Sequence, residues 1–180
     1  MPREVEIRIK RLAAEILDLS LRLKYSKSCG TSGAGVFTFA ESCTGGLIAS
    51  SITSLPGVSA VFPGSVVTYG NRAKIEQLSV TPETIEQCGA VSARCAAEMA
   101  RGALSLFDTT LAVSVTGIAG PDGGSDAKPV GMVWFAIAHS DGRMRLKRGF
   151  YPGRPRIGVQ MTAALAALGL LADGLRYEIG

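Results

Sequence analysis

Residues 36–46 read VFTFAESCTGG, and this stretch decides the fold. Its first part, VFTFA, is short, aromatic and β-branched, which predicts a buried strand. The polar turn ESCTGG follows, and a helix is expected from Gly45 to about Thr53. A buried strand that runs directly into a helix is typical of α/β folds, in which helices cover the faces of a largely parallel sheet.

The flanking segments continue this alternation of strands and helices. Hydrophobic spacing predicts an amphipathic helix over residues 3–24, and the stretch KSCGTSGAG at 27–35 is expected to be a loop. Further strands are predicted at 65–70, 109–115, 131–139 and 143–151, and further helices at 73–78, 81–88, 92–107 and 157–175. The pair Asp141 and Gly142 indicates a hairpin between the last two strands. The expected fold is one domain over residues 1–180, a three-layer α/β/α sandwich with a mixed β-sheet.

Composition excludes several classes of protein. With 47% hydrophobic and 19% charged residues, the chain has the composition of a folded globular domain. The longest strongly apolar stretch, at 161–172, is far shorter than the ~20 residues of a spanning helix, so no membrane segment is predicted. The first ten residues lack a secretory signal, which favours the cytoplasm. The net charge of +4 favours anionic ligands weakly, and no basic run interleaved with aromatics indicates a nucleic-acid partner.

The first of three polar strand-to-loop junctions is AESCTGG at residues 40–46. It places the hydroxyls of Ser42 and Thr44 and several free backbone N–H groups at the start of a helix. This arrangement suits an anion, and it also suits a serine nucleophile whose oxyanion is stabilised by N–H groups. The alternative is that Ser42 or Thr44 simply caps the helix.

The second junction, TYGNRAK at 68–74, ends in Lys74. A lysine there is ordinarily solvated, but in a dry cleft its neutral form would be favoured. A neutral amine can accept the proton of a serine hydroxyl. The two interpretations of Lys74 remain open at this point.

The third junction, TGIAGPDGGSDAKPVG at 116–131, is a long loop between two predicted buried strands. Such loops are usually functional, and Gly117 and Gly120 would let the backbone approach a ligand, while Thr116 offers a hydroxyl. The spacing of a Walker A loop is absent, and a purely structural loop is the alternative.

The remaining chemistry-bearing residues narrow the choice of mechanism. The single histidine, His139, lies at a predicted strand end away from all three junctions, which makes a Ser/His/Asp triad improbable and Lys74 the better base. Glu41, Asp122 and Asp126 give only a weak metal signal, so no metal is expected. The Cys43 thiol is interpreted as small packing.

Several longer motifs carry a family resemblance. AESCTGG, VTYGNRAKIEQLSV, GAVS, SVTGIAGPDGGSDAKPVG and VWFA, in this order, resemble the carboxy-terminal domain of the CinA family over residues 38–152. Members that consist of this domain alone are nicotinamide mononucleotide deamidases. The resemblance implies hydrolysis of the carboxamide of nicotinamide mononucleotide to nicotinic acid mononucleotide and ammonia, a step of pyridine nucleotide salvage. It also implies a homodimer and no cofactor.

By motif position, the resemblance makes Ser42 the nucleophile and Lys74 its base, with Tyr69 and Thr116 completing the catalytic set. The expected substrate-binding residues lie in the same junctions and in the segment that precedes the last helix: Glu41, Thr44, Gly45, Gly46, Asn71, Gly117, Gly120, Arg154 and Arg156. Oxyanion stabilisation is expected from N–H groups near residues 44–46 or from Gly117.

One segment departs from the family pattern. Where relatives usually have an FxGDR-like segment that supplies an arginine to the site, this chain reads YPGRPRIGVQ at 151–160. Pro155 falls where that arginine is expected, so Arg154 or Arg156 would have to take its role. Two other functions therefore stay open: a catalytically silent nucleotide-binding or regulatory module, and a structural dimer whose glycine loops serve assembly.

Overall fold

A computed structural model of the chain describes residues 2–26 and 34–179. Most of the predicted loop at 27–35, with Cys29, lies outside the described residues. The elements follow in the order α1 (Pro2–Tyr25), β1 (Phe37–Glu41), α2 (Leu47–Thr53), the 3-10 turn η1 (Val58–Ala60), β2 (Ser65–Val67), α3 (Asn71–Leu78), α4 (Pro82–Gln87), α5 (Ala93–Phe107), β3 (Leu111–Gly117), β4 (Met132–His139), β5 (Met144–Phe150) and α6 (Arg156–Ile179).

The strands form a five-stranded mixed sheet in the order β2-β1-β3-β4-β5. β1 pairs in parallel with β2 and β3, whereas β4 is antiparallel to both β3 and β5. All of β1 and nearly all of β3 are buried, as central strands covered on both faces should be. The α/β class, the mixed sheet and the late hairpin are confirmed.

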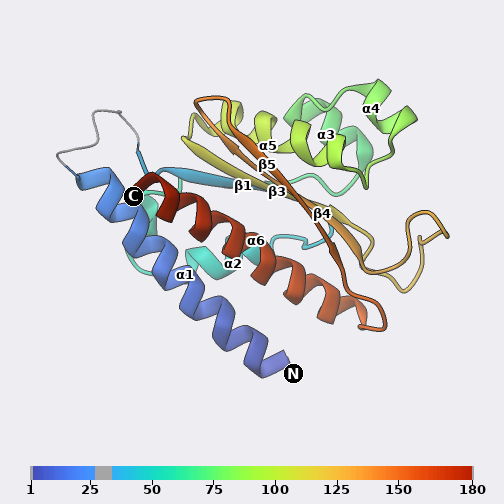
Figure 1. Cartoon of the computed structure of the whole chain (residues 1–180), viewed down its shortest axis with the longest axis horizontal. Helices are drawn as coiled ribbons and strands as arrows, with labels where there is room; N and C mark the ends of the chain where they lie inside the picture. Colours follow the sequence, from blue (N-terminus) through green and yellow to red (C-terminus); the bar gives the residue numbers. More distant parts are fainter. Residues whose placement is uncertain (1, 27–33, 180) are drawn as a thin grey trace.

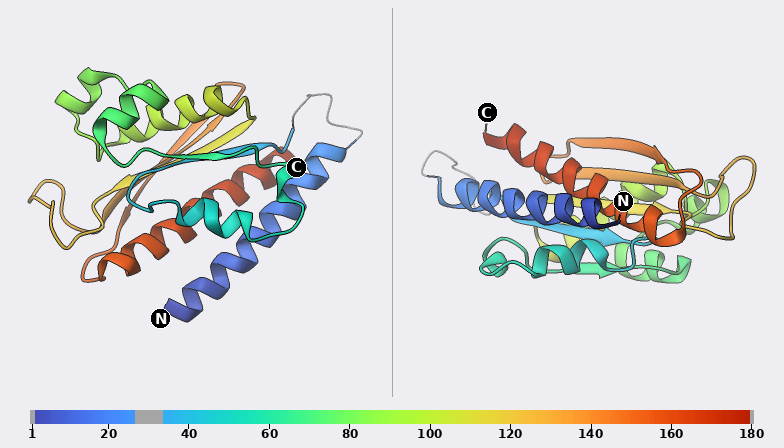
Figure 2. Two further views of the ribbon diagram at one scale, coloured as in Figure 1. Left: turned by 180° about the vertical axis from the view of Figure 1, so that it is seen from behind. Right: turned by 90° about the horizontal axis from the view of Figure 1, so that it is seen from below.

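Helices cover both faces of this sheet (Figure 1). α5, with α3 and α4 beside it, lies on one face, and α6 and α2 lie on the other (Figure 2). α1 packs on α6 and α2 through a stripe of buried residues at helical spacing, which includes Ile9, Ala13 and Ile16. The three predicted layers are present, and α1 lies on the outer side of one of them.

The long apolar helix α6 owes its composition to packing on two sides. By length and composition it is the one helix among the described residues that could cross a membrane, and 50% of its most apolar window is buried inside the protein. Because α6 contacts α1 as well as β3 and β4, both of its sides need apolar residues. We interpret it as a core helix.

The parallel pairing has one consequence for function. β1, β2 and β3 point the same way, so their carboxyl ends lie at one edge of the sheet. These ends lead into all three polar junctions of the sequence. In open α/β sheets this edge is where ligands bind.

Candidate active site

A cavity of about 250 Å³ lies at the carboxyl ends of β1, β2 and β3. Residues from all three junctions line it, together with Ala90 and Val91 before α5 and Arg156 at the start of α6. The lining residues are Ser42, Cys43, Tyr69, Asn71, Lys74, Ala90, Val91, Thr116, Gly117, Ile118, Ala119, Gly120, Asp122, Gly123 and Arg156. The structure therefore brings together eight of the predicted site residues: Ser42, Tyr69, Asn71, Lys74, Thr116, Gly117, Gly120 and Arg156.

Ser42 and Lys74 meet at the bottom of this cavity. Ser42 directly follows β1, and its N–H donates to the Val115 carbonyl at 3.0 Å, which extends the parallel ladder by one bond. Lys74 is on α3 and only 1% exposed. Its Nζ lies 3.0 Å from Ser42 Oγ, 2.7 Å from the Thr68 carbonyl oxygen and 3.2 Å from the Tyr69 carbonyl oxygen.

This environment shifts the protonation equilibrium of Lys74 toward its neutral form. Burial lowers the pKa of its amine, because a charged ammonium loses hydration in the interior. No carboxylate in the described part of the chain forms a salt bridge with it. The two carbonyls can only accept, so a neutral amine donates its two N–H bonds to them and directs its lone pair at the Ser42 hydroxyl.

The start of α2 is capped by a carboxylate, not by a hydroxyl. Glu41, fully buried at the end of β1, accepts from the N–H groups of Gly46 at 3.0 Å, Ile48 at 3.2 Å and Ala49 at 2.8 Å. The alternative that Ser42 or Thr44 caps the helix is therefore wrong. Glu41, predicted to bind substrate, instead satisfies the helix N-terminus and does not line the cavity.

Hydrogen bonds within the same turn occupy two of the N–H groups that were candidate oxyanion donors. The Gly45 N–H donates to the Ser42 carbonyl at 3.1 Å, and the Gly46 N–H is taken by Glu41. Gly45 and Gly46 have φ of 63° and 96°, a conformation that glycine adopts without strain. α2 begins directly after them, at Leu47. Neither glycine lines the cavity, and neither does Thr44, whose buried hydroxyl has no partner among the described residues.

Gly117 remains as a donor beside the serine. After the bond from Ser42 N–H to Val115, the next bond of a parallel ladder would run from Gly117 N–H to the Ser42 carbonyl. Within the described residues that bond is not made, since the Ser42 carbonyl has turned to Gly45. The Gly117 N–H therefore faces the side of β3 where Ser42 lies, in the lining of the cavity.

Arg156 bridges two of the loops that line the cavity. Its Nη1 donates to the Gly120 carbonyl at 2.7 Å and its Nη2 donates to the Tyr69 hydroxyl oxygen at 2.6 Å. Thr116, 1% exposed, donates its hydroxyl to the Ala90 carbonyl at 2.8 Å and so ties the end of β3 to the segment before α5. Asn71, the first residue of α3, lines the cavity beside Lys74.

Arg154 does not belong to this cavity. Its Nη1 donates to Thr162 Oγ1 at 3.0 Å, and it lines a separate apolar pocket with Val5 and Ile157. Of the two arginines that the sequence left as candidates, the structure brings only Arg156 to the site.

Several residues around the serine were not predicted from the sequence. Asp122, which the sequence offered only as part of a weak metal signal, lines the cavity, and so do Ala90 and Val91, for which only the GAVS motif at 89–92 gave a signal. Gln160, on α6, donates its Nε2 to the Cys43 carbonyl at 2.9 Å. Burial raises the pKa of the Cys43 thiol to about 12, so this neighbour of Ser42 stays protonated at neutral pH.

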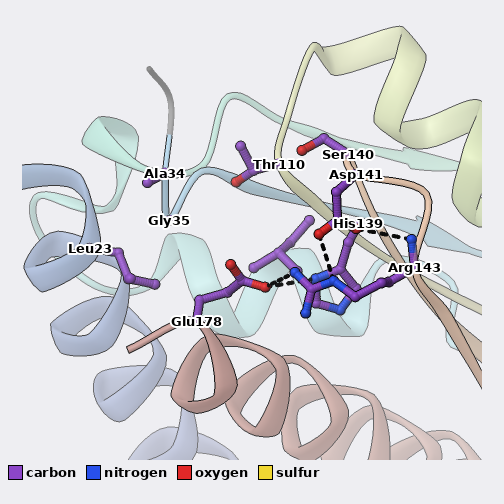
Figure 3. A pocket seen from close by; sticks show the side chains of 10 residues that line it. Leu23, Ala34, Gly35, Thr110, His139, Ser140, Asp141, Arg143 and Glu178 are labelled. Atoms are coloured by element: carbon purple, nitrogen blue, oxygen red, sulfur yellow. Dashed lines mark hydrogen bonds and ion pairs between the residues drawn. The ribbon is translucent and has the colours of Figure 1, made fainter. Parts of the chain in front are cut away.

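His139 lies at the other edge of the sheet, in a pocket of about 150 Å³ near the start of β1 and β3 (Figure 3). Its Nδ1 is 3.1 Å from Glu178 Oε1, and Arg143 pairs with the same carboxylate. The prediction that His139 is distant from the three junctions is confirmed. Among the described residues no group of three His, Cys, Asp or Glu side chains could hold a metal ion, and Asp126 does not line the cavity.

Comparison with known proteins gives a consistent family. The model of the CinA C-terminal domain matches residues 21–175. A nicotinamide-nucleotide amidohydrolase PncC from Enterobacter agglomerans is 52% identical over 131 residues, which are 73% of this chain and 79% of that protein. A CinA-like protein from Fervidobacterium nodosum is 58% identical over 105 residues, 58% of this chain but 26% of that protein. This chain thus spans only about a quarter of the length of that relative.

Solved structures agree. The competence/damage inducible protein CihA from Agrobacterium tumefaciens superposes with a TM-score of 0.84 at 38% identity, covering 94% of this chain and 96% of that one. The competence damage-inducible protein A from Klebsiella pneumoniae superposes with a TM-score of 0.82 at 34% identity, covering 93% and 97%.

Proposed function

Because this chain belongs to the CinA C-terminal domain family, we propose that it is an amidohydrolase that converts nicotinamide mononucleotide to nicotinic acid mononucleotide and ammonia. The observation that carries the proposal is the 3.0 Å contact between Lys74 Nζ and Ser42 Oγ in a buried site. The name of the Enterobacter agglomerans relative, a nicotinamide-nucleotide amidohydrolase, supports the choice of substrate.

The first chemical step is acylation of Ser42. Lys74 takes the hydroxyl proton, and Oγ attacks the carboxamide carbon of the substrate, which gives a tetrahedral intermediate with a negatively charged oxygen. The Gly117 N–H is the donor placed to stabilise that oxygen. When the intermediate collapses, the C–N bond breaks, the Lys74 ammonium returns its proton to the leaving nitrogen, and ammonia departs.

The second step is hydrolysis of the acyl-enzyme ester. Water attacks the ester carbon while Lys74 takes one of its protons, and the same N–H group stabilises the second tetrahedral intermediate. Collapse breaks the bond to Ser42 Oγ, which regains a proton from Lys74. The products are nicotinic acid mononucleotide and free enzyme, so Lys74 serves as base and acid in turn.

Arg156 is the group we assign to the phosphate of the substrate. It is the arginine among the described residues that lines the cavity, it is exposed, and it is held by Tyr69 and Gly120. A guanidinium is well suited to a phosphate because it offers paired donors in a fixed plane. Asn71 and the backbone of residues 117–120 complete the binding surface of the proposal.

A homodimer in the cytoplasm, acting without a cofactor, remains our prediction for the assembled protein. The second candidate function is a silent nucleotide-binding module, favoured by the altered segment at 151–160. Titration of the protein with nicotinamide mononucleotide, with chromatography for nicotinic acid mononucleotide, separates the two. An enzyme forms the product and loses it in Ser42→Ala with its affinity kept. A binding module binds equally in both proteins and forms none.

A further inference from the structure

We propose that Gln160 is a positioning residue that holds the turn carrying Ser42 in its reactive geometry; the inference rests on the proposed function. Gln160 is on α6, and its Nε2 donates to the Cys43 carbonyl oxygen at 2.9 Å, across 117 residues of chain. A carbonyl oxygen only accepts, so the amide must present its NH₂ group to it. The contact therefore fixes the side-chain amide as well as the turn.

The peptide group that Gln160 holds joins Cys43 to Thr44, one residue beyond the nucleophile. Ser42 is anchored before it by its N–H bond to Val115, and Gly46 is anchored after it by Glu41. Between these anchors, Gly45 is tied back to the Ser42 carbonyl, whereas the Cys43 carbonyl accepts no backbone hydrogen bond among the described residues. A hydrogen bond to the Cys43 carbonyl thus restrains the least constrained part of the turn.

That restraint also fixes the direction of the next backbone N–H, although Thr44 does not line the cavity. In a trans peptide the C=O and N–H bonds point in opposite directions, so fixing the Cys43 carbonyl fixes the direction of the Thr44 N–H. It also limits movement of the chain next to Ser42, and with it displacement of Ser42 Oγ from Lys74 Nζ. Small displacements of a nucleophile lower turnover strongly, because reaction needs near-contact geometry.

Gln160 acts from the same face of α6 as Arg156. The two residues are four positions apart, which is about one helical turn. Arg156 reaches the Tyr69 hydroxyl and the Gly120 carbonyl, while Gln160 reaches Cys43. The first turns of α6 therefore contact the loops after β1, β2 and β3, and they come from the segment that departs from the family pattern.

The test compares Gln160→Leu with Gln87→Leu, a matched change at an exposed position on α4. For Gln160→Leu we expect kcat to fall about tenfold or more, with KM and the pH profile unchanged, because neither the substrate contacts nor Lys74 is altered. Hydrogen–deuterium exchange over residues 42–47 should accelerate in Gln160→Leu and not in Gln87→Leu. Gln160→Glu keeps the length but cannot donate when ionised, and it should show both effects.

Hydrogen–deuterium exchange and turnover together distinguish failure of the positioning role from failure of the proposed function. Unchanged exchange over 42–47 in both Gln160 variants overturns the positioning role, whatever the activity. A lower melting temperature with kcat per folded molecule unchanged assigns Gln160 a structural role only and also overturns it. If the wild-type protein releases no ammonia, the proposed function fails, and the exchange measurement still decides whether Gln160 restrains the turn.

Discussion

Lys74 Nζ lies 3.0 Å from Ser42 Oγ, and the carbonyl oxygens of Thr68 and Tyr69 take two further directions around the same nitrogen. An amine in that position is costly to charge, since its hydration is lost and no carboxylate compensates for it among the described residues. The cost is consistent with the proposed mechanism, in which the neutral amine of Lys74 takes the proton of the Ser42 hydroxyl. Strained or desolvated groups of this kind are typical of active sites.

Replacing Lys74 with Met tests the base. Met fills a similar volume without an amine, so we expect turnover to fall by about a hundredfold or more while the fold is retained. Two effects on stability oppose each other, because the desolvation cost of the amine is removed while the Thr68 and Tyr69 carbonyls lose their donor. Ammonia release measures turnover, and thermal unfolding measures the net effect on stability. A variant that keeps most of its rate shows that another group takes the serine proton.

The lowered pKa of Lys74 sets the direction of the pH dependence of activity. In the proposed mechanism the working form is the neutral amine, so kcat/KM should rise with pH as Lys74 loses its proton, at a pH below the ordinary 10.5. A pH profile of ammonia release checks this. A rate that falls as pH rises through the neutral range contradicts the assignment of Lys74 as base.

The same shift predicts the pH dependence of stability. Between the lowered pKa in the folded protein and 10.5 in the unfolded chain, the unfolded chain binds one more proton at Lys74. The free energy of unfolding therefore rises with pH, and Lys74→Met should lose that slope. Urea unfolding should be compared below about pH 9, because burial raises the pKa of Cys43 and Cys95 from 9.0 to about 12 and about 11, which lowers stability at higher pH. Equal slopes in both proteins would refute the prediction.

Glu41→Gln tests the carboxylate cap of α2. The native side chain accepts three backbone N–H bonds, and a glutamine would turn an NH₂ group toward donors. We expect a loss of about 2 kcal/mol in the free energy of unfolding, measured by urea denaturation. Glu86→Gln, at an exposed position on α4, is the matched control and should change little. If both variants unfold alike, Glu41 is not the cap that stabilises this turn.

Arg156 and Arg154 form a natural pair for testing phosphate recognition. Arg156 lines the cavity and Arg154 bonds to Thr162 outside it. Arg156→Gln should raise KM for nicotinamide mononucleotide about tenfold or more, through loss of a charged hydrogen bond, and Arg154→Gln should leave KM unchanged. Steady-state kinetics on both variants decide the point. The reverse result would place the substrate phosphate on the other arginine.

The sequence predicted the fold well because its signals are local. The strand VFTFA, the helix starts near Thr81 and Ser92, and the Asp141–Gly142 hairpin each depend on a few neighbouring residues, and all four are confirmed. The site was harder to predict because its contacts join distant elements. The burial of Lys74, for instance, arises from the packing of α3 on α5, which the local pattern NRAKIEQL does not reveal.

Three contacts of the site could not be predicted from the sequence, because each depends on how the chain folds in three dimensions. Glu41 caps α2 from the end of the preceding strand, five to eight residues before its donors, outside the usual spacing of a capping residue. Arg156 lies at the first position of α6 and bonds to Tyr69 and Gly120, whereas Arg154 bonds to Thr162 of the same helix. Gln160 meets Cys43 only through the packing of α6 on α2.

The most direct test of the account is ammonia release from nicotinamide mononucleotide by the purified protein after treatment with EDTA, beside the Ser42→Ala variant. The account predicts release by the wild type and none by Ser42→Ala, with the variant folded and still able to bind the nucleotide. Release by both proteins, or loss of release on removing metal, would contradict a serine nucleophile activated by Lys74.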